Sequence, residues 1–207
     1  MILVGQYDSP YTRRVAVSLH LLGFAFEHDT RSVFGDFDSM RMTNPLGRIP
    51  SLILDDGTTL IDSAAILDWL DQQAGPGRAL LPPGGPARQQ VLQRIALATG
   101  TIDKVMGIGY ERLVRPERYR WPEWIERCRT QAEGGLAALA SLSWCVDQRL
   151  DQAWITTACM MRYVRLAVPE LLPVGRYPTL DAVPNRCEAL PAFKATWPAD
   201  YTVPPPA

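Results

Sequence analysis

A segment dense in proline and glycine, residues 75–86, divides the chain into two parts of different character. Eight of its twelve residues are Gly or Pro. This composition excludes a regular helix or strand, because proline lacks an amide donor and glycine has little conformational preference. Short apolar runs alternate with helical patterns before this segment, and only helical patterns follow it. The sequence therefore predicts two domains, over 1–75 and 87–207, joined by a linker over 76–86.

The part before the linker mixes strand and helix signals. The apolar run at 2–4 predicts a strand, and Ser9 followed by Pro10 predicts the start of a helix that Gly23 ends. The turn signal at 55–57 predicts a hairpin. The expected elements are, in order, a strand at 2–4, a helix at 11–22, a strand at 24–28, a loop with one short helix at 31–43, strands at 49–54 and 59–61, and a helix capped by Asp62 and Ser63.

This order of elements specifies an α/β arrangement for the first domain. A strand–helix–strand unit closes as a parallel pair with a right-handed crossover, and a tight hairpin closes as an antiparallel pair. The result is a thioredoxin-like βαβ-ββα domain, a small mixed sheet flanked by helices. The second domain is expected to be all-α, because apolar residues recur in it at helical spacing. Its expected helices are 87–106, 122–142, 153–168 and 180–190.

Charge and composition exclude several classes of function. The chain has a formal net charge of −1, and this balance argues against a nucleic-acid partner, which requires a basic stripe. No apolar run approaches the ~18 residues of a membrane span, and the N-terminus has no signal-peptide pattern. We therefore expect a cytoplasmic protein with no membrane partner. The four cysteines and two histidines lack metal-ligand spacing, which predicts no metal site.

Three short motifs carry the strongest functional signal. They are Ser-Pro-Tyr-Thr-Arg-Arg-Val at 9–15, Asn-Pro-Leu-Gly-Arg-Ile-Pro at 44–50, and Asp-Ser at 62–63. This set, in this order, resembles the cytosolic glutathione S-transferase superfamily, as a serine-type, bacterial-like member. The resemblance covers the whole chain and is best over the first 75 residues. It implies glutathione as co-substrate, a small electrophile as second substrate, a homodimer, a role in detoxification and no metal.

The second and third motifs are expected to hold glutathione. The resemblance implies a cis peptide at Ile49–Pro50, which would present the Ile49 N–H and C=O to the cysteinyl backbone of glutathione. The N-terminus of the helix after Asp62, together with the Ser63 hydroxyl, would hold the γ-glutamyl carboxylate, because unpaired N–H groups there favour an anion. Asp62 departs from the Glu or Gln of many members. A plain turn and a plain helix cap are the structural alternatives.

Ser9 is the catalytic candidate that the resemblance implies. A serine hydroxyl does not act as a base here, but it can donate a hydrogen bond to a thiolate, and the helix N-terminus adds a favourable dipole. No Cys occupies residues 9–12, which disfavours the redox branch of the family. Three alternatives stay open: Ser9 only caps its helix, the hydroxyl of Tyr7 takes its place, or, more distantly, that of Tyr11 does.

The remaining candidates for substrate binding are Arg48, in the second motif, and Met106 and Tyr110, as linings of an electrophile pocket against the first helix of the second domain. The function that follows is a transferase that stabilises the glutathione thiolate and conjugates it to an electrophilic small molecule. The alternatives are a glutathione-binding scaffold or regulatory protein without turnover, and a glutathione-dependent peroxidase or isomerase.

Overall fold

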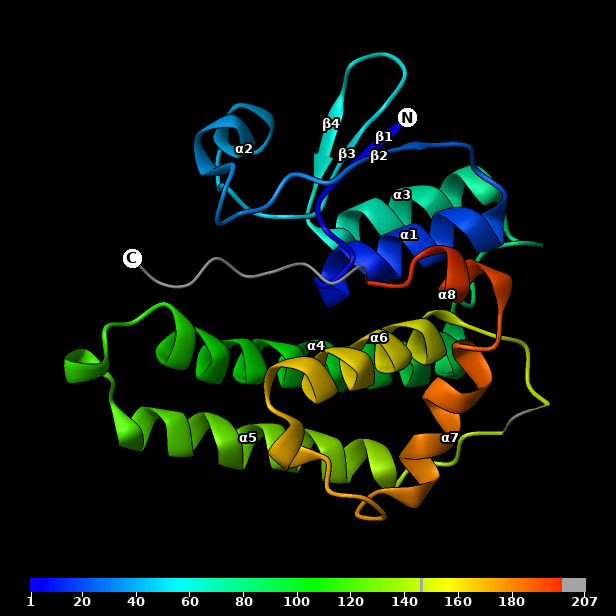
Figure 1. The fold of residues 1–207 in the computed structure, drawn as a ribbon. Coiled ribbons are helices and arrows are strands. Elements are labelled where there is room, and N and C mark those ends of the chain that lie inside the picture. The colour runs from blue at the N-terminus through cyan, green and yellow to red at the C-terminus, as the bar shows by residue number, and fades with distance from the viewer. Residues whose placement is uncertain (146, 199–207) are drawn as a thin grey trace. The chain divides into compact units, whose positions relative to one another are not determined.

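The computed structural model describes residues 1–145 and 147–198, which form two compact units (Figure 1). The first unit contains Met1–Arg88 and, from the C-terminal part of the chain, residues 189–198. The second unit contains Gln89–Glu188. These units are defined by contacts within the fold. The predicted domain limits of 1–75 and 87–207, with a linker over 76–86, stay a prediction.

The first unit contains a four-stranded mixed sheet in the order β2-β1-β3-β4. Strand β1 pairs in parallel with β2 and antiparallel with β3, and β3 pairs antiparallel with β4. This topology confirms the thioredoxin-like arrangement expected from the sequence. The strands are β1 (Ile2–Val4), β2 (Glu27–Asp29), β3 (Ser51–Ile53) and β4 (Thr59–Ile61).

Strand β2 starts later than the predicted 24–28, because the chain first completes the C-terminal cap of the preceding helix. Helix α1 (Pro10–Leu22) ends at Gly23, which has a φ of 74°. The Phe24 N–H then donates to the Leu19 carbonyl at 3.0 Å. This turn is a helix-capping motif that left-handed glycine favours. Phe24 is therefore part of the cap, and the strand begins only at Glu27.

Helices α1 and α3 (Ser63–Ala74) lie side by side against one face of the sheet (Figure 1). Both helices contribute apolar side chains to the core, and Val15, Leu19, Ile66 and Leu70 are fully buried. Burying each such side chain stabilises the fold by about 1.5–3 kcal/mol. The short helix α2 (Phe37–Thr43) lies in the expected loop between β2 and β3. This packing fixes the N-termini of α1 and α3 relative to the sheet.

A short helix from the C-terminal part of the chain, α8 (Pro191–Ala195), packs on α1. The Arg13 guanidinium is buried and donates to the carbonyls of Thr196 at 3.0 Å and Phe193 at 3.2 Å. It also lies near the rings of Phe193 and Trp197. Carbonyls at a helix C-terminus lack intrahelical donors, and a cation satisfies them well. The sequence analysis missed this helix, since nothing in its short pattern indicates a return to the first unit.

Helices make up the second unit, and among the described residues no strand follows Ile61, as expected. Helix α6 (Gln152–Ala167) is buried from Gln152 to Met161, and Trp154 within it is fully buried. No helix in the described part is long and apolar enough to cross a membrane. The elements after α3, before α8, are α4 (Gly85–Leu113), the 3₁₀ turn η1 (Glu117–Tyr119), α5 (Pro122–Ala140), α6 (Gln152–Ala167), the 3₁₀ turn η2 (Pro169–Leu171) and α7 (Pro178–Cys187).

Helix α4 is longer than the predicted 87–106 at both ends. It begins at Gly85, inside the predicted linker, because proline at 86 is tolerated in a first helical turn. It continues past Gly107, which does not end the helix but allows close packing of α4 against a neighbouring side chain. A Cβ at Gly107 would lie 3.2 Å from the sulfur of Cys128, on α5. Glycine at position 107 therefore leaves room on α4 for the Cys128 side chain of α5.

Candidate functional site

The strand register places the second and third motifs at the same end of the sheet. Val4 pairs with Ser51, and Ser51 pairs with Ile61. The next residue beyond each of these positions at that end is Gly5 after β1, Pro50 before β3 and Asp62 after β4. Three segments that are distant in the sequence therefore meet where the strands end, beside the N-termini of α1 and α3.

Glycine at position 5 allows the segment around Ile49 to come against the first turn of α1. Gly5 has a φ of +129°, and a Cβ on it would lie 2.7 Å from Ile49 Cβ and 2.7 Å from Thr12 Oγ1. Real Cβ atoms essentially never approach so closely. The close contact thus brings the second motif next to the helix that Ser9 begins.

The loop of the second motif is held by its own polar groups. Asn44 is buried, its Nδ2 donates to the Arg48 carbonyl at 2.7 Å, and its Oδ1 accepts from the Leu46 N–H at 3.0 Å. The Ile49–Pro50 peptide is cis, as the resemblance implied. Within the described residues, no hydrogen bond involves the Ile49 backbone. The loop therefore presents an unpaired donor and acceptor at Ile49.

Asp62 adopts a backbone conformation that a plain helix cap does not need. Its φ is 68° and its ψ 127°, and it is the one described non-glycine residue with positive φ. Its Oδ1 accepts from the Ala64 N–H at 2.8 Å. By contrast, Ser9 caps α1 from an ordinary extended conformation. Such strained positions cost about 1–3 kcal/mol and are concentrated at functional sites.

Ser63, the first residue of α3, is bound by an arginine that the sequence analysis did not select. Arg14 Nη2 and Nε donate to Ser63 Oγ at 2.7 and 3.1 Å, and both residues are 3% exposed. The sequence signal for Arg14 is a pair of adjacent arginines inside a predicted helix. In the structure no residue of α1 from Thr12 to Leu19 is exposed, so both arginines require partners within the fold.

The Ser9 hydroxyl is only weakly engaged in capping α1. Its Oγ accepts from the Thr12 N–H at 3.4 Å, longer than the usual distance of about 2.9–3.0 Å. The residue is half-buried. Just before it, burial raises the pKa of the Asp8 carboxyl, although backbone N–H bonds act in the opposite direction. The N-terminus of α1 thus keeps a hydroxyl with capacity for another partner.

Tyr7, the alternative to Ser9, is 8% exposed and stacks on a histidine. The rings of Tyr7 and His28 lie 3.9 Å apart at an interplanar angle of 5°, and His28 Nε2 is 2.7 Å from the Gly5 carbonyl. This stack holds the tyrosine against β2. His28 is a neighbour of the site that the sequence analysis missed, because a stack between residues 21 positions apart has no local pattern.

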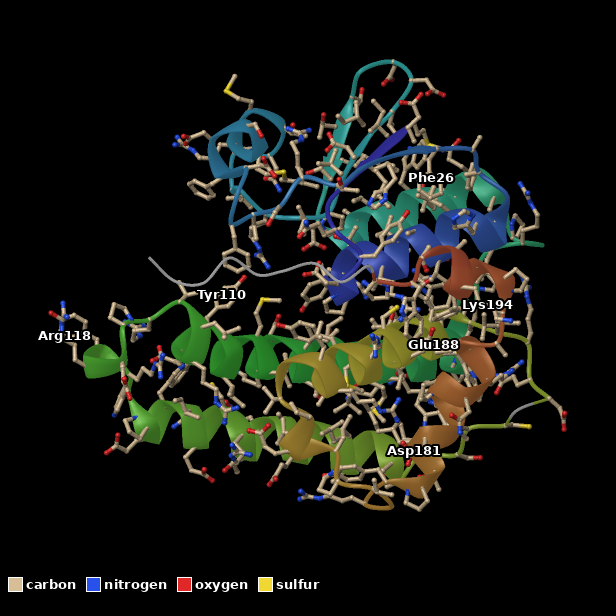
Figure 2. All side chains as sticks on the ribbon, viewed as in Figure 1. Phe26, Tyr110, Arg118, Asp181, Glu188 and Lys194 are labelled. Atoms are coloured by element: carbon tan, nitrogen blue, oxygen red, sulfur yellow. The ribbon has the colours of Figure 1, made fainter. Side chains whose placement is uncertain are left out.

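The other candidates lie elsewhere or on the surface. The Arg48 side chain is exposed and forms no hydrogen bond or ion pair with the described residues. Met106 and Tyr110 lie four residues apart on α4, in the second unit, and so share a face of that helix. Tyr110 is labelled in Figure 2 and is 45% exposed by its accessible surface. Their place in an electrophile pocket stays a prediction. The described residues contain no cluster of His, Cys, Asp and Glu that could hold a metal ion.

Comparisons with known proteins agree with this architecture. Residues 3–79 match the family described as glutathione S-transferase, N-terminal domain. A relative from Drosophila melanogaster named probable maleylacetoacetate isomerase 1 is 30% identical over 99% of this chain and 84% of its own length. A relative from Vibrio cholerae named probable maleylacetoacetate isomerase is 30% identical over 93% of each chain.

Two solved structures are similar over nearly the whole chain. A glutathione S-transferase from Methylobacterium radiotolerans, in complex with glutathione sulfonate, has 31% identity and a TM-score of 0.89, and covers 98% of this chain and 96% of its own. A glutathione transferase family member from Pseudomonas fluorescens Pf-5, with bound glutathione, has 32% identity and a TM-score of 0.84 over 96% and 98%. The chain therefore belongs to the cytosolic glutathione S-transferase superfamily.

Proposed function

We propose that this chain is a glutathione-dependent enzyme that binds glutathione in its first unit and stabilises the thiolate for attack on an electrophilic carbon. One observation carries the proposal above the others. The unpaired backbone of Ile49 adjoins the first turn of α1, which Ser9 caps, and α1 is joined through Arg14 to the N-terminus of α3. One ligand can thus place its peptide group at Ile49, its sulfur at the N-terminus of α1 and its carboxylate at the N-terminus of α3.

The peptide part of glutathione suits the unpaired backbone of Ile49, just before β3. An extended peptide exchanges N–H and C=O hydrogen bonds with unpaired backbone groups, as an added strand does. The Ile49 backbone supplies one donor and one acceptor for the cysteinyl residue. The γ-glutamyl carboxylate lies at the N-terminus of α3, where unpaired N–H groups and the helix dipole favour an anion. Ser63 adds its hydroxyl to this carboxylate.

The thiolate is stabilised at the N-terminus of α1. A thiol with a pKa of about 8.5 is about 3% ionised at pH 7, so a nucleophile of this kind requires a lower pKa. A decrease of two units corresponds to roughly 2.7 kcal/mol of stabilisation. The Ser9 hydroxyl donates to the sulfur, and the N-terminal N–H groups of α1 add their partial positive charge.

The chemical step forms one carbon–sulfur bond. The thiol proton leaves to solvent, and the thiolate lone pair attacks the electrophilic carbon. With a substrate that carries a leaving group, that group departs with its bonding electron pair. With an activated alkene, the adjacent carbon takes up a proton instead. In both cases one glutathione is consumed for each product.

A second candidate function, isomerisation, is favoured by the names of the two relatives described above. In this reaction the thiolate adds to a carbon of an activated cis-alkene, the former double bond rotates, and the carbon–sulfur bond breaks again. The trans-alkene forms and glutathione is released unchanged. The same thiolate and the same carboxylate site serve both reactions, so the difference lies in the second substrate.

Thiol counting separates these functions. The protein is incubated with glutathione and, in parallel, with an aryl halide and with maleylacetoacetate as the activated cis-alkene. Conjugation lowers total free thiol by one equivalent per product, whereas isomerisation yields trans-alkene at constant thiol. Glutathione binding without turnover of either substrate, or of a wider electrophile panel, would overturn the enzyme proposal in favour of a glutathione-binding scaffold.

We also propose that the protein is a homodimer, which rests on the family to which it belongs. Light scattering coupled to size-exclusion chromatography tests this directly. A mass near twice the 23.1 kDa of one chain is expected, and a mass near one chain at micromolar concentration would contradict it.

A further inference from the structure

We propose that Arg14 is a positioning residue that fixes the Ser63 hydroxyl as a hydrogen-bond donor to the ligand carboxylate. The inference rests on the proposed function, since it assigns a role within the glutathione site. It concerns a residue of the first motif that does not itself contact the ligand: Arg14 lies just after the first turn of α1 and acts through Ser63.

The hydrogen bonds themselves define the role. A serine oxygen has two lone pairs and one proton. Arg14 Nε and Nη2 both donate to Ser63 Oγ, at 3.1 and 2.7 Å, and so occupy the accepting capacity of that oxygen. The capacity that remains is the O–H donor. Ser63 is therefore set to meet a group that accepts, such as a carboxylate, and not a group that donates, such as an ammonium.

The surroundings of the pair strengthen its effect. Arg14 and Ser63 are each 3% exposed, so solvent screens the guanidinium charge little. The guanidinium also lies over the Tyr11 ring at 5.6 Å, which limits its freedom. A buried cation behind the first residue of α3 adds to the partial positive charge of that helix N-terminus. Both effects favour an anion at the same place.

The fork of an arginine matters to this role. Two donors in a fixed plane reach one oxygen from two sides, which a lysine ammonium cannot reproduce in the same geometry. Arg14→Lys keeps the charge and loses the fork, whereas Arg14→Gln loses both. A merely structural strut between α1 and α3 would affect folding in both variants but would not discriminate between ligands.

The test is a double-mutant cycle read by calorimetry with two ligands. The ligands are glutathione and γ-aminobutyryl-cysteinyl-glycine, which lacks only the γ-glutamyl carboxylate. Arg14→Gln is expected to weaken glutathione binding by about tenfold or more, as for a lost hydrogen bond to a charged group. Binding of the decarboxy analogue changes by less than about twofold. The glutathione affinity of Arg14→Lys is expected to lie between those of Arg14→Gln and the unaltered protein.

The cycle is completed in a Ser63→Ala background. There, Arg14→Gln is expected to weaken glutathione binding clearly less than it does with Ser63 in place, because the hydroxyl through which Arg14 acts is missing and only the effect of its charge is lost. An equal loss in both backgrounds, or an equal loss for both ligands, would overturn the inference. Arg13→Gln is the matched control, since its buried guanidinium bonds the carbonyls of α8 instead. It should lower stability without discriminating between the ligands.

Failure of the proposed function has a different signature. If the unaltered protein takes up no glutathione at millimolar concentration, the proposed function is wrong and the inference with it. If the unaltered protein binds glutathione and the Arg14 variants bind both ligands as it does, only the inference is wrong. Circular dichroism and urea unfolding show which variants are folded, and Arg14→Lys keeps the test open if Arg14→Gln does not fold.

Discussion

Gly5 and Ile49 approach so closely that a Cβ added to residue 5 would lie 2.7 Å from the Ile49 Cβ. This contact ties the end of β1 to the segment that presents the unpaired Ile49 backbone. It also explains why glycine stands at position 5, since the φ of +129° already disfavours other residues. The Ile49 segment, which is proposed to bind glutathione, can take this position only because residue 5 has no Cβ.

Gly5→Ala is expected to lower the free energy of unfolding by about 2 kcal/mol or more, through the clash and the positive φ together. Urea unfolding measures this loss. Gly57→Ala is the matched control, because Gly57 also has positive φ but a Cβ there would meet nothing within 4 Å. Equal losses in the two variants would mean that the contact with Ile49 and Thr12 contributes nothing.

Arg13→Leu is expected to lower the free energy of unfolding by about 2–4 kcal/mol, because it leaves the buried carbonyls of Phe193 and Thr196, at the end of α8, without this donor. Detachment of α8 should also speed trypsin cleavage after Lys194, which lies on that helix (Figure 2). Urea unfolding and limited proteolysis with mass spectrometry check the two effects. Arg48→Leu, at an exposed arginine, should leave both unchanged.

The local features of the fold could be predicted from the sequence because they depend on neighbouring residues. Ser9, Pro10 and Gly23 mark the limits of α1, and the turn at 55–57 forces the hairpin, whatever the rest of the chain does. The three motifs pointed to one binding site only through the family resemblance, and the strand register shows where they meet. Each of these signals is a short-range constraint on backbone conformation.

The features that the sequence analysis missed depend on contacts between distant segments. Arg13 finds its partners 180 or more residues along the chain, and Arg14 finds Ser63 49 residues along. The stack of Tyr7 on His28 likewise has no counterpart in local periodicity. Two adjacent arginines inside a buried helix indicate that partners exist, but the partners are set by packing.

Asp8→Asn is expected to raise the free energy of unfolding at neutral pH. Burial raises the pKa of Asp8, so between its ordinary and raised values the folded state holds more protons than the unfolded state. The free energy of unfolding therefore falls as the pH rises through that window, and it stays lower above it. Asparagine carries no charge to desolvate. Urea unfolding at pH 7 should show the gain, and the gain should disappear in acid, where Asp8 is protonated in both states.

Asp56→Asn gives a control of opposite sign. Hydrogen bonds from Thr58 lower the pKa of the exposed Asp56, which stabilises the fold above the ordinary pKa of the carboxyl. This contribution is lost as the pH falls through the lowered pKa. Asp56→Asn should therefore lower the free energy of unfolding at pH 7 and have no effect in strong acid. A gain at pH 7 for both variants would contradict this account of the two carboxyls.

The most direct test of the central claim is the ultraviolet titration of the glutathione thiol bound to the unaltered protein and to Ser9→Ala. In the unaltered protein the bound thiol should titrate well below the ordinary value of about 8.5. In Ser9→Ala its pKa should return most of the way, with glutathione affinity kept within about twofold, whereas Tyr7→Phe should keep the lowered pKa. An unshifted thiol in the unaltered protein, or the same lowered pKa in Ser9→Ala, would contradict the account.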